Sequence, residues 1–194
     1  QVYSNTGGQS STASYMGQNT KFSVHGKVIP GKIERRKELA NICMMHPNTF
    51  VAQTSCAMTN HFYKSIMAAN EYDGPAVVSV YTTCQPEHGV GDNMAMQQSK
   101  LAVDTRTFPV LIYDPRKGDK IAQRLSLQGN PSEKLDFFIE PKTNEVYDFI
   151  RFARTEGRFA KHFDKDGNPS ETLLKATQER LDNWHTLQEL AGII

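Results

Sequence analysis

The apolar positions of the chain fall into short runs, and polar stretches of helix-forming composition separate these runs. The runs that predict strands are 49–54, 76–81 and 110–113. The second of them is a nearly continuous β-branched run, which is typical of a parallel strand buried on both faces. The segments that predict helices are 37–45, 59–71 and 95–105, and Thr59 would cap the second of them. This alternation of helices and strands predicts an α/β fold in which helices flank a parallel sheet.

The character of the chain changes after residue 116. Residues 116–142 are charged and interrupted by glycine and proline, which indicates a connection that runs along the surface. We expect Thr143 to cap an amphipathic helix and Ser170 to begin a last one. The predicted organisation is therefore an α/β part over residues 1–116 and a mostly helical C-terminal extension over residues 117–194. The arginines that recur at helical spacing, and so predict a solvated face, are Arg151, Arg154 and Arg158.

Charge and composition exclude several classes of partner. The formal net charge of +1 predicts no electrostatic footprint for nucleic acid. No apolar stretch approaches the roughly 20 residues that cross a bilayer, so we expect no membrane span. The three cysteines are odd in number and widely spaced, which favours a reducing, cytoplasmic environment over a disulfide framework. The chain opens inside an apolar-then-turn pattern, which indicates a fragment or a processed piece of a longer protein.

A glycine-rich loop follows the first apolar residues. Val2 and Tyr3 are predicted to form a strand, and the loop reads Ser4-Asn5-Thr6-Gly7-Gly8. Consecutive backbone amides in such a loop can form a concave anion site, and a diphosphate requires one at the carboxyl end of a parallel strand. Gly-Gly turns also connect elements without binding a ligand. Local chemistry therefore leaves both interpretations open.

Further blocks of sequence give this loop a context. The ordered blocks are Val2-Tyr3-Ser4-Asn5-Thr6-Gly7-Gly8, Ala68-Ala69-Asn70-Glu71-Tyr72-Asp73-Gly74-Pro75 and Tyr81-Thr82-Thr83-Cys84-Gln85-Pro86-Glu87-His88-Gly89. In this order they resemble the C-terminal part of the thiamine-diphosphate-binding domain of pyruvate:ferredoxin (flavodoxin) oxidoreductases. The resemblance covers residues 2–116. Residues 117–194 match no pattern of that family that we can assign.

The resemblance implies an enzyme. It implies oxidative decarboxylation of a 2-oxoacid, pyruvate in the first place, to an acyl-coenzyme A, with thiamine diphosphate, Mg²⁺ and [4Fe-4S] clusters as cofactors. The implied partners are the remainder of the oxidoreductase chain or complex, ferredoxin or flavodoxin, and a second copy of the full enzyme in a homodimer. Two alternatives stay open: the same chemistry on 2-oxoglutarate or an aryl-2-oxoacid, and a structural or docking subunit whose loop is a relic.

The resemblance also assigns roles in the loop. The backbone carbonyl of Val2 would be a Mg²⁺ ligand, since hard cations take oxygen ligands. Thr6, Gly7 and Gly8 would bind the cofactor. Asn5 would be catalytic, because its amide can orient the 2-oxoacid carbonyl and stabilise developing negative charge. Outside this family, Val2 would be an ordinary strand residue and Asn5 an Asx-turn residue.

One cysteine acquires a role in the same way. Cys84 would be the fourth thiolate of a [4Fe-4S] cluster whose other three cysteines lie upstream. By itself, a cysteine after a buried strand is more often a packed small hydrophobe. His88 is either a packed histidine or a hydrogen-bond donor that tunes the cluster. Cys43 and Cys56 have no counterpart role, and we expect both to be buried thiols.

Overall fold

A four-stranded sheet lies at the centre of the computed structural model, which describes residues 2–3, 9–10, 12–46 and 48–194. β3 (Phe50–Ser55) and β4 (Ala76–Tyr81) are parallel, whereas β5 (Leu111–Tyr113) is antiparallel to β3 and β6 (Leu125–Ser126) is antiparallel to β5. The predicted α/β class is confirmed, and the sheet is mixed, with one parallel pair. In spatial order the strands are β4, β3, β5 and β6.

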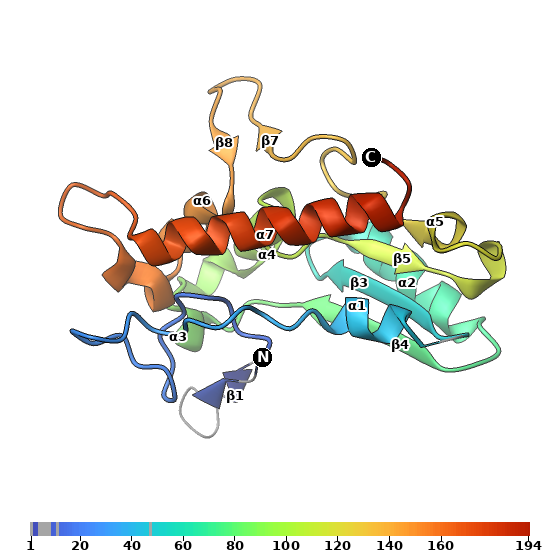
Figure 1. The fold of residues 1–194 in the computed structure, drawn as a ribbon, viewed down its shortest axis with the longest axis horizontal. Helices are drawn as coiled ribbons and strands as arrows, with labels where there is room; N and C mark the ends of the chain where they lie inside the picture. Colours follow the sequence, from blue (N-terminus) through green and yellow to red (C-terminus); the bar gives the residue numbers. More distant parts are fainter. Residues whose placement is uncertain (1, 4–8, 11, 47) are drawn as a thin grey trace.

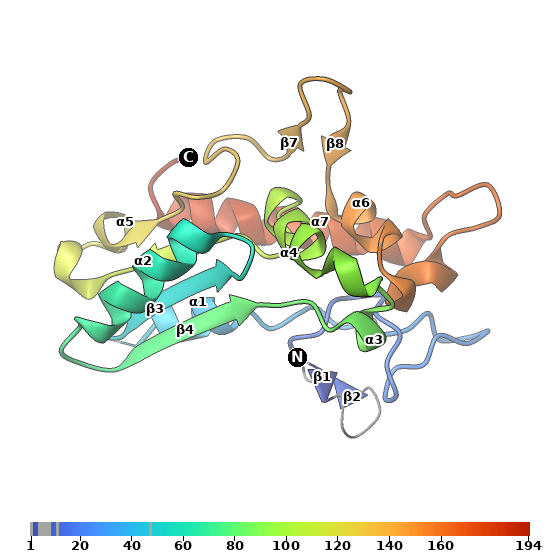
Figure 2. The same ribbon diagram turned by 180° about the vertical axis from the view of Figure 1, so that it is seen from behind.

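Helix α2 (Thr59–Asn70) makes the crossover that a parallel strand pair requires. It covers the face of the sheet that is turned to the viewer in Figure 2, and its His61 Nδ1 lies 2.9 Å from Thr54 Oγ1 of β3. The prediction that Thr59 caps this helix is wrong. Thr59 is already the first helical residue, and Met58 occupies the cap position without a side-chain hydrogen bond.

The two parallel strands differ in burial. All six residues of β3 are buried, because β3 lies between two neighbouring strands and under helices. β4 lies at the edge of the sheet, and of its residues only Tyr81, the last one, is buried. The expectation that 76–81 is buried on both faces is therefore wrong for this chain, since β4 has β3 as its one neighbour in the sheet.

The opposite face of the sheet carries α1 (Leu39–Met44) and α7 (Glu171–Leu190). Figure 1 shows α7 running in front of the sheet along the length of the molecule. Trp184 and Leu187 of α7 pack in one apolar cluster with Val51 of β3 and Leu111 of β5. The C-terminal extension thus completes the core of the sheet. No helix in the described part of the chain is long and apolar enough to cross a bilayer.

The predicted start of the last helix is confirmed. Ser170 is the N-cap residue of α7, and its side-chain oxygen accepts a hydrogen bond from the backbone N–H of Leu173 at 3.4 Å. Serine at this position satisfies one of the free amides of the first turn. The helix reaches Leu190, and Gly192 follows with a φ of +67°, which is a left-handed conformation that glycine adopts without strain.

Two predictions for the C-terminal part are wrong. The segment 116–142 is not only a surface connection, because β6 within it joins the central sheet. Thr143 does not cap a helix, because a β-hairpin lies there. Helix α6 (Phe149–Arg154) begins later, where the Asp148 carboxylate accepts a hydrogen bond from the backbone N–H of Arg151 at 2.9 Å. Figure 1 shows the hairpin projecting from the body. The elements of this part are η3 (Pro115–Lys117), α5 (Ile121–Arg124), β7 (Phe138–Ile139), β8 (Val146–Tyr147), α6 (Phe149–Arg154) and η4 (Gly157–His162).

A second, aromatic core lies beyond the end of β4. Tyr81 contacts Phe108 with ring centroids 5.3 Å apart, and Phe152 of α6 contacts Phe159 of η4 at 6.4 Å. Tyr15 of the N-terminal segment belongs to the same cluster. This core fixes the N-terminal segment, the end of β4 and the C-terminal helices relative to one another, and the candidate site lies against it.

Candidate functional site

The predicted diphosphate loop lies almost entirely outside the described residues. Of the loop and its flanks, the structure describes β1 (Val2–Tyr3) and β2 (Gln9–Ser10), which pair antiparallel with Val2 opposite Ser10. The predicted strand at Val2 is confirmed. β1 and β2 form a sheet of their own, apart from β3 and β4 (Figure 1). Asn5, Thr6, Gly7 and Gly8 lie outside the described residues.

Cys84 lies at the carboxyl end of the parallel pair. It follows β4 and occupies the N-cap position of α3 (Gln85–His88), with a half-buried side chain. The neighbouring Thr83 holds this turn in place: its Oγ1 lies 3.1 Å from Ser99 Oγ and donates to the carbonyl oxygen of Ala95 at 3.3 Å. Ligands of α/β proteins bind at this end of parallel strands, so the thiol is in the place where a cofactor is expected.

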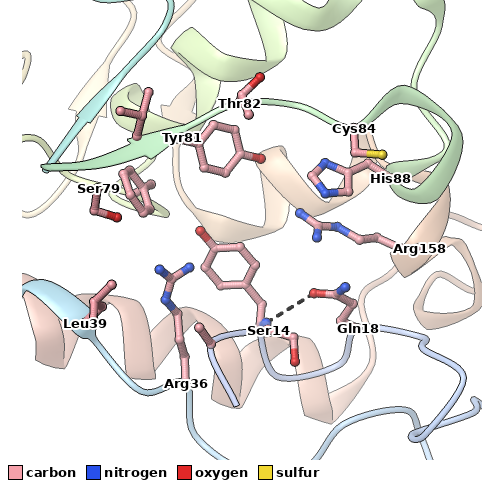
Figure 3. Close-up of a pocket in the computed structure, with 14 residues that line it drawn as sticks. Ser14, Gln18, Arg36, Leu39, Ser79, Tyr81, Thr82, Cys84, His88 and Arg158 are labelled. Atoms are coloured by element: carbon pink, nitrogen blue, oxygen red, sulfur yellow. Dashed lines mark hydrogen bonds between the residues drawn. The ribbon is translucent and has the colours of Figure 1, made fainter. Parts of the chain in front are cut away.

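Cys84 lines a cavity of about 390 Å³, within the range of roughly 300–1,000 Å³ for ligand pockets. Figure 3 shows Tyr81, Cys84 and His88 on one side, Ser14 and Arg36 on the other, and Arg158 projecting between them. The wall therefore joins the N-terminal segment, the end of β4, α3 and η4. Its remaining lining residues are Ala13, Tyr15, Gln18, Leu39, Ser79, Val80, Thr82 and Phe108.

Behind the cavity wall, Glu156 collects hydrogen bonds from three elements. Its side chain is fully buried and accepts from Gln98 Nε2 at 2.9 Å and from the Tyr81 hydroxyl at 3.4 Å. The Nε of Arg158 pairs with its second oxygen. A buried carboxylate requires such partners, because an uncompensated charge in the interior is strongly destabilising. Glu156 thereby anchors the guanidinium group of Arg158 at the cavity.

Arg158 keeps its charge in the interior. Burial alone would lower the pKa of its guanidinium group, but the Glu156 carboxylate, together with the Tyr81 and Tyr15 hydroxyl groups, outweighs this effect, and the pKa is raised. The group also lies over the Tyr15 ring, with Cζ 5.6 Å from the centroid. The prediction that Arg158 belongs to a solvated face is wrong, since its side chain is 4% exposed. Arg154, in contrast, is exposed as expected.

A second guanidinium group lies on the opposite wall. Arg36 Cζ is 4.6 Å from the Tyr15 ring centroid and 5.3 Å from that of Phe108, at distances typical of cation–π contacts. Its Nε forms an ion pair with Glu38 Oε2 at 3.3 Å. The buried Arg158 and the half-buried Arg36 thus line one cavity, and both guanidinium groups contact the Tyr15 ring. Each of these guanidinium groups has a carboxylate partner, Glu38 for Arg36 and Glu156 for Arg158.

His88 is a packed histidine that also lines the cavity. Its side chain is buried, and its Nδ1 lies 3.6 Å from Glu156 Oε1. Burial, with a further contribution from the positive charge of Arg158, lowers the pKa of His88 to about 3. His88 is therefore neutral near pH 7, and the cavity owes its positive charge to the arginines.

The cysteines differ in their surroundings. Among the described residues, no group of three or more histidine, cysteine, aspartate or glutamate side chains could hold a metal ion. The ligand role of Cys84 stays a prediction. Cys43 packs against the core of the sheet, and Cys56 Sγ lies 3.9 Å from Met96 Sδ. Both are half-buried, so the expectation of fully buried thiols is wrong.

Sequence reasoning missed most of the cavity. Tyr15, Arg36 and Glu156 carry no motif, and they come from distant parts of the chain. The one local signal is a glycine at position 157. Gly89 lies so close to it that a Cβ added at Gly89 would be 2.7 Å from Gly157 Cα. From a single sequence, that contact between α3 and η4 cannot be inferred.

No protein-family model matches the chain. The pyruvate-flavodoxin oxidoreductase of Rhodospirillum rubrum is 33% identical over an alignment of 195 residues, which covers 100% of this chain and 15% of that protein. The pyruvate:ferredoxin oxidoreductase of Moorella thermoacetica is 32% identical over 194 residues, 97% of this chain and 15% of that protein. The pyruvate synthase subunit PorB of Thermotoga maritima is 28% identical over 192 residues, 98% of this chain and 53% of the subunit.

The chain thus spans about half of PorB and a much smaller share of the longer relatives. The similarity extends beyond the blocks at 2–116 and includes the C-terminal extension, which carries Glu156 and Arg158. The relationship that the sequence blocks indicated is confirmed: along its whole length, this chain is a homologue of one segment of the pyruvate:ferredoxin and pyruvate-flavodoxin oxidoreductases.

Proposed function

We propose that this chain is part of a pyruvate oxidoreductase that uses thiamine diphosphate, Mg²⁺ and [4Fe-4S] clusters and forms acetyl-coenzyme A, passing electrons to ferredoxin or flavodoxin. The observation that carries the proposal is the position of Cys84, a half-buried cysteine at the carboxyl end of the parallel strands, in the wall of a cavity that Arg36 and the buried Arg158 also line. The names of the relatives support pyruvate as the substrate and flavodoxin or ferredoxin as the acceptor.

In this proposal Cys84 supplies one thiolate to a cluster, and the other ligands come from parts of the enzyme outside these residues. The cavity fits that group in two respects. It presents a cysteine at its wall, and its charged groups are positive, as a cluster of net negative charge with thiolate ligands requires. The buried Tyr81 and Phe108 side chains contribute an apolar surround that limits access of water.

The N-terminal loop would hold the organic cofactor. The carbonyl of Val2 would bind Mg²⁺, and the backbone N–H groups of Thr6, Gly7 and Gly8 would donate hydrogen bonds to the diphosphate. Asn5 would hold the 2-oxoacid carbonyl by hydrogen bonding through its amide. Thiamine diphosphate supplies the carbon chemistry when bound, and the protein supplies position and electrostatics.

The test is made on the complete enzyme that contains this chain. We expect coenzyme A-dependent oxidation of pyruvate, coupled to reduction of ferredoxin or flavodoxin, that requires added thiamine diphosphate and Mg²⁺. Activity on 2-oxoglutarate or an aryl-2-oxoacid, with none on pyruvate, would show that pyruvate is not the substrate. No activity on any 2-oxoacid, with the cofactors present, would leave a structural or docking subunit in place of an enzyme.

The role of Asn5 has its own test. Asn5→Ala should lower turnover of the complete enzyme while thiamine diphosphate still binds with nearly unchanged affinity, because the amide contacts the substrate and not the diphosphate. Removal of one such electrostatic donor typically costs about 100-fold or more in turnover. Unchanged turnover would show that Asn5 is only a turn residue.

A further inference from the structure

We infer that β4 is an inner strand of the complete protein, in which a parallel strand from polypeptide outside these 194 residues pairs with its free edge. Among the described residues, β4 has β3 as its one neighbour in the sheet, and Figure 2 shows its other edge at the margin of the molecule. The inference goes beyond the proposed function, because it holds whichever substrate and cofactors the complete enzyme uses.

The first argument is a row of backbone groups that point away from β3. The backbone N–H of Phe50 donates to the carbonyl oxygen of Pro75 at 2.9 Å, and the N–H of Cys56 donates to that of Tyr81 at 3.1 Å. The peptide groups of alternate residues point to opposite edges of a strand, so every second residue between Pro75 and Tyr81 faces away from β3. The residues that direct their N–H and C=O groups to the free edge are Ala76, Val78 and Val80.

The second argument is that this edge lacks the features that protect the edges of natural sheets. These features are very short strands, charged side chains, prolines and bulges. The opposite edge of the same sheet is protected by its length, because β6 has only two residues. β4 has six residues without a charge or a proline, and its register with β3 is continuous. Such an edge is a template for the addition of another strand.

The third argument identifies the partner strand. A nearly continuous β-branched run is typical of a strand between parallel neighbours, and β4 already has one parallel neighbour in β3. In a two-fold dimer of this chain, the two β4 strands would instead pair antiparallel. The relatives contain further polypeptide, since the alignment with PorB covers 98% of this chain but 53% of that subunit. A strand from the corresponding further polypeptide is therefore the occupant that fits this edge.

The partner strand would also complete one wall of the cavity. Val80 is 40% exposed and Leu39 of α1 is 48% exposed, and both line the cavity together with Ser79. A strand paired with β4 would lie beside these residues. Because it runs parallel, its carboxyl end would lie next to the end of β4, which Cys84 follows. The residues after the partner strand would thus be placed at the cavity, where ligands of α/β proteins bind.

The first experiment is hydrogen–deuterium exchange of the complete enzyme, resolved to single residues in the segment 76–81. The amides of Val77 and Ser79 face β3 and are controls on the same strand, whereas those of Val78 and Val80 report on the other edge. We expect Val78 and Val80 to exchange within about tenfold of Val77 and Ser79, because strands on both sides protect both sets. Faster exchange than this at Val78 and Val80, as at an edge open to solvent, would overturn the inference.

A cross-link identifies the partner. Val80→p-benzoylphenylalanine places a photoreactive group on an exposed side chain of the free edge, and the linked peptides of the irradiated complete enzyme are identified by mass spectrometry. We expect a linked peptide from polypeptide outside residues 1–194. A link to β4 of a second copy, or links only within residues 1–194, would overturn the inference. Neither measurement depends on turnover, so failure of the proposed activity is distinguishable from failure of the strand pairing.

Discussion

The backbone N–H of Gly157 donates to the carbonyl oxygen of Gly89 at 3.2 Å, and this hydrogen bond joins the two elements that carry Arg158 and Cys84. Gly89 has a φ of +64°, a left-handed conformation that side chains disfavour. A Cβ at Gly89 would also lie 2.7 Å from Gly157 Cα, which is backbone that cannot easily yield. The contact therefore requires glycine, and it sets the distance between the two walls of the cavity.

Gly89→Ala should destabilise the chain by about 2 kcal/mol, because the substitution combines an unfavourable φ with a backbone clash. The measurement is the free energy of unfolding in urea. Gly26→Ala is the matched control, since an added Cβ there meets no atom within 4 Å. Equal effects of the two substitutions would show that the contact between α3 and η4 does not constrain the fold.

Glu156→Gln should cost about 3 kcal/mol in the free energy of unfolding. The amide keeps the shape of the side chain but leaves the buried guanidinium group of Arg158 without a compensating charge. The control is Glu145→Gln, which breaks the ion pair between Glu145 and Arg151. The side chains of these residues are 54% and 33% exposed, respectively. That pair should contribute less than about 1 kcal/mol. If Glu156→Gln lowered the free energy of unfolding by an equally small amount, this result would contradict the anchoring role of Glu156.

His162 should make the stability depend on pH. Its Nδ1 lies 2.7 Å from Ser170 Oγ, and its Nε2 lies 2.7 Å from the Gly17 carbonyl oxygen. The neutral ring can therefore accept a hydrogen bond from the Ser170 hydroxyl and donate one to Gly17. Burial lowers the pKa of His162 below its ordinary value of 6.5, even though the hydrogen bond to Gly17 acts in the other direction. The unfolded chain then binds more protons than the folded one as the pH falls through 6.5, and the stability decreases.

His162→Gln tests this pH dependence, because glutamine can donate and accept at similar places but does not titrate. The free energy of unfolding, measured between about pH 7 and pH 5, should fall more steeply for wild type than for the variant. Parallel curves would contradict the assignment. The expected consequence in wild type is a weaker attachment of the N-terminal segment to η4 in acid, since Gly17 is the partner of the ring.

The sequence predicted the features that depend on neighbours along the chain. The strand at 76–81 and the helix that Ser170 caps are local patterns, and both are present. The direction of β5 was not predictable, because an apolar run of three or four residues does not encode the strand with which it pairs. Thr143 was a plausible cap by composition, but Asp148 offers its carboxylate where the backbone turns into α6.

The site shows the same division. Cys84 could be identified because its flanking residues form a recognisable block. Arg158 and Glu156 could not be identified, because Glu156 forms its hydrogen bonds with Gln98 and Tyr81, which lie 58 and 75 positions away in the sequence. At the level of sequence, Arg158 differs in no way from an exposed arginine at helical spacing. Its role becomes visible only when tertiary packing places its charge beside a buried carboxylate.

The ligand role of Cys84 is tested most directly by counting iron in the complete enzyme. Cys84→Ser is compared with Cys43→Ser and Cys56→Ser, which replace cysteines that lie outside the cavity lining. Iron and acid-labile sulfide should fall by the content of about one [4Fe-4S] cluster in Cys84→Ser, with loss of one paramagnetic resonance signal, and should stay at the wild-type level in the two controls. Wild-type iron content and an unchanged set of signals in Cys84→Ser would contradict the account.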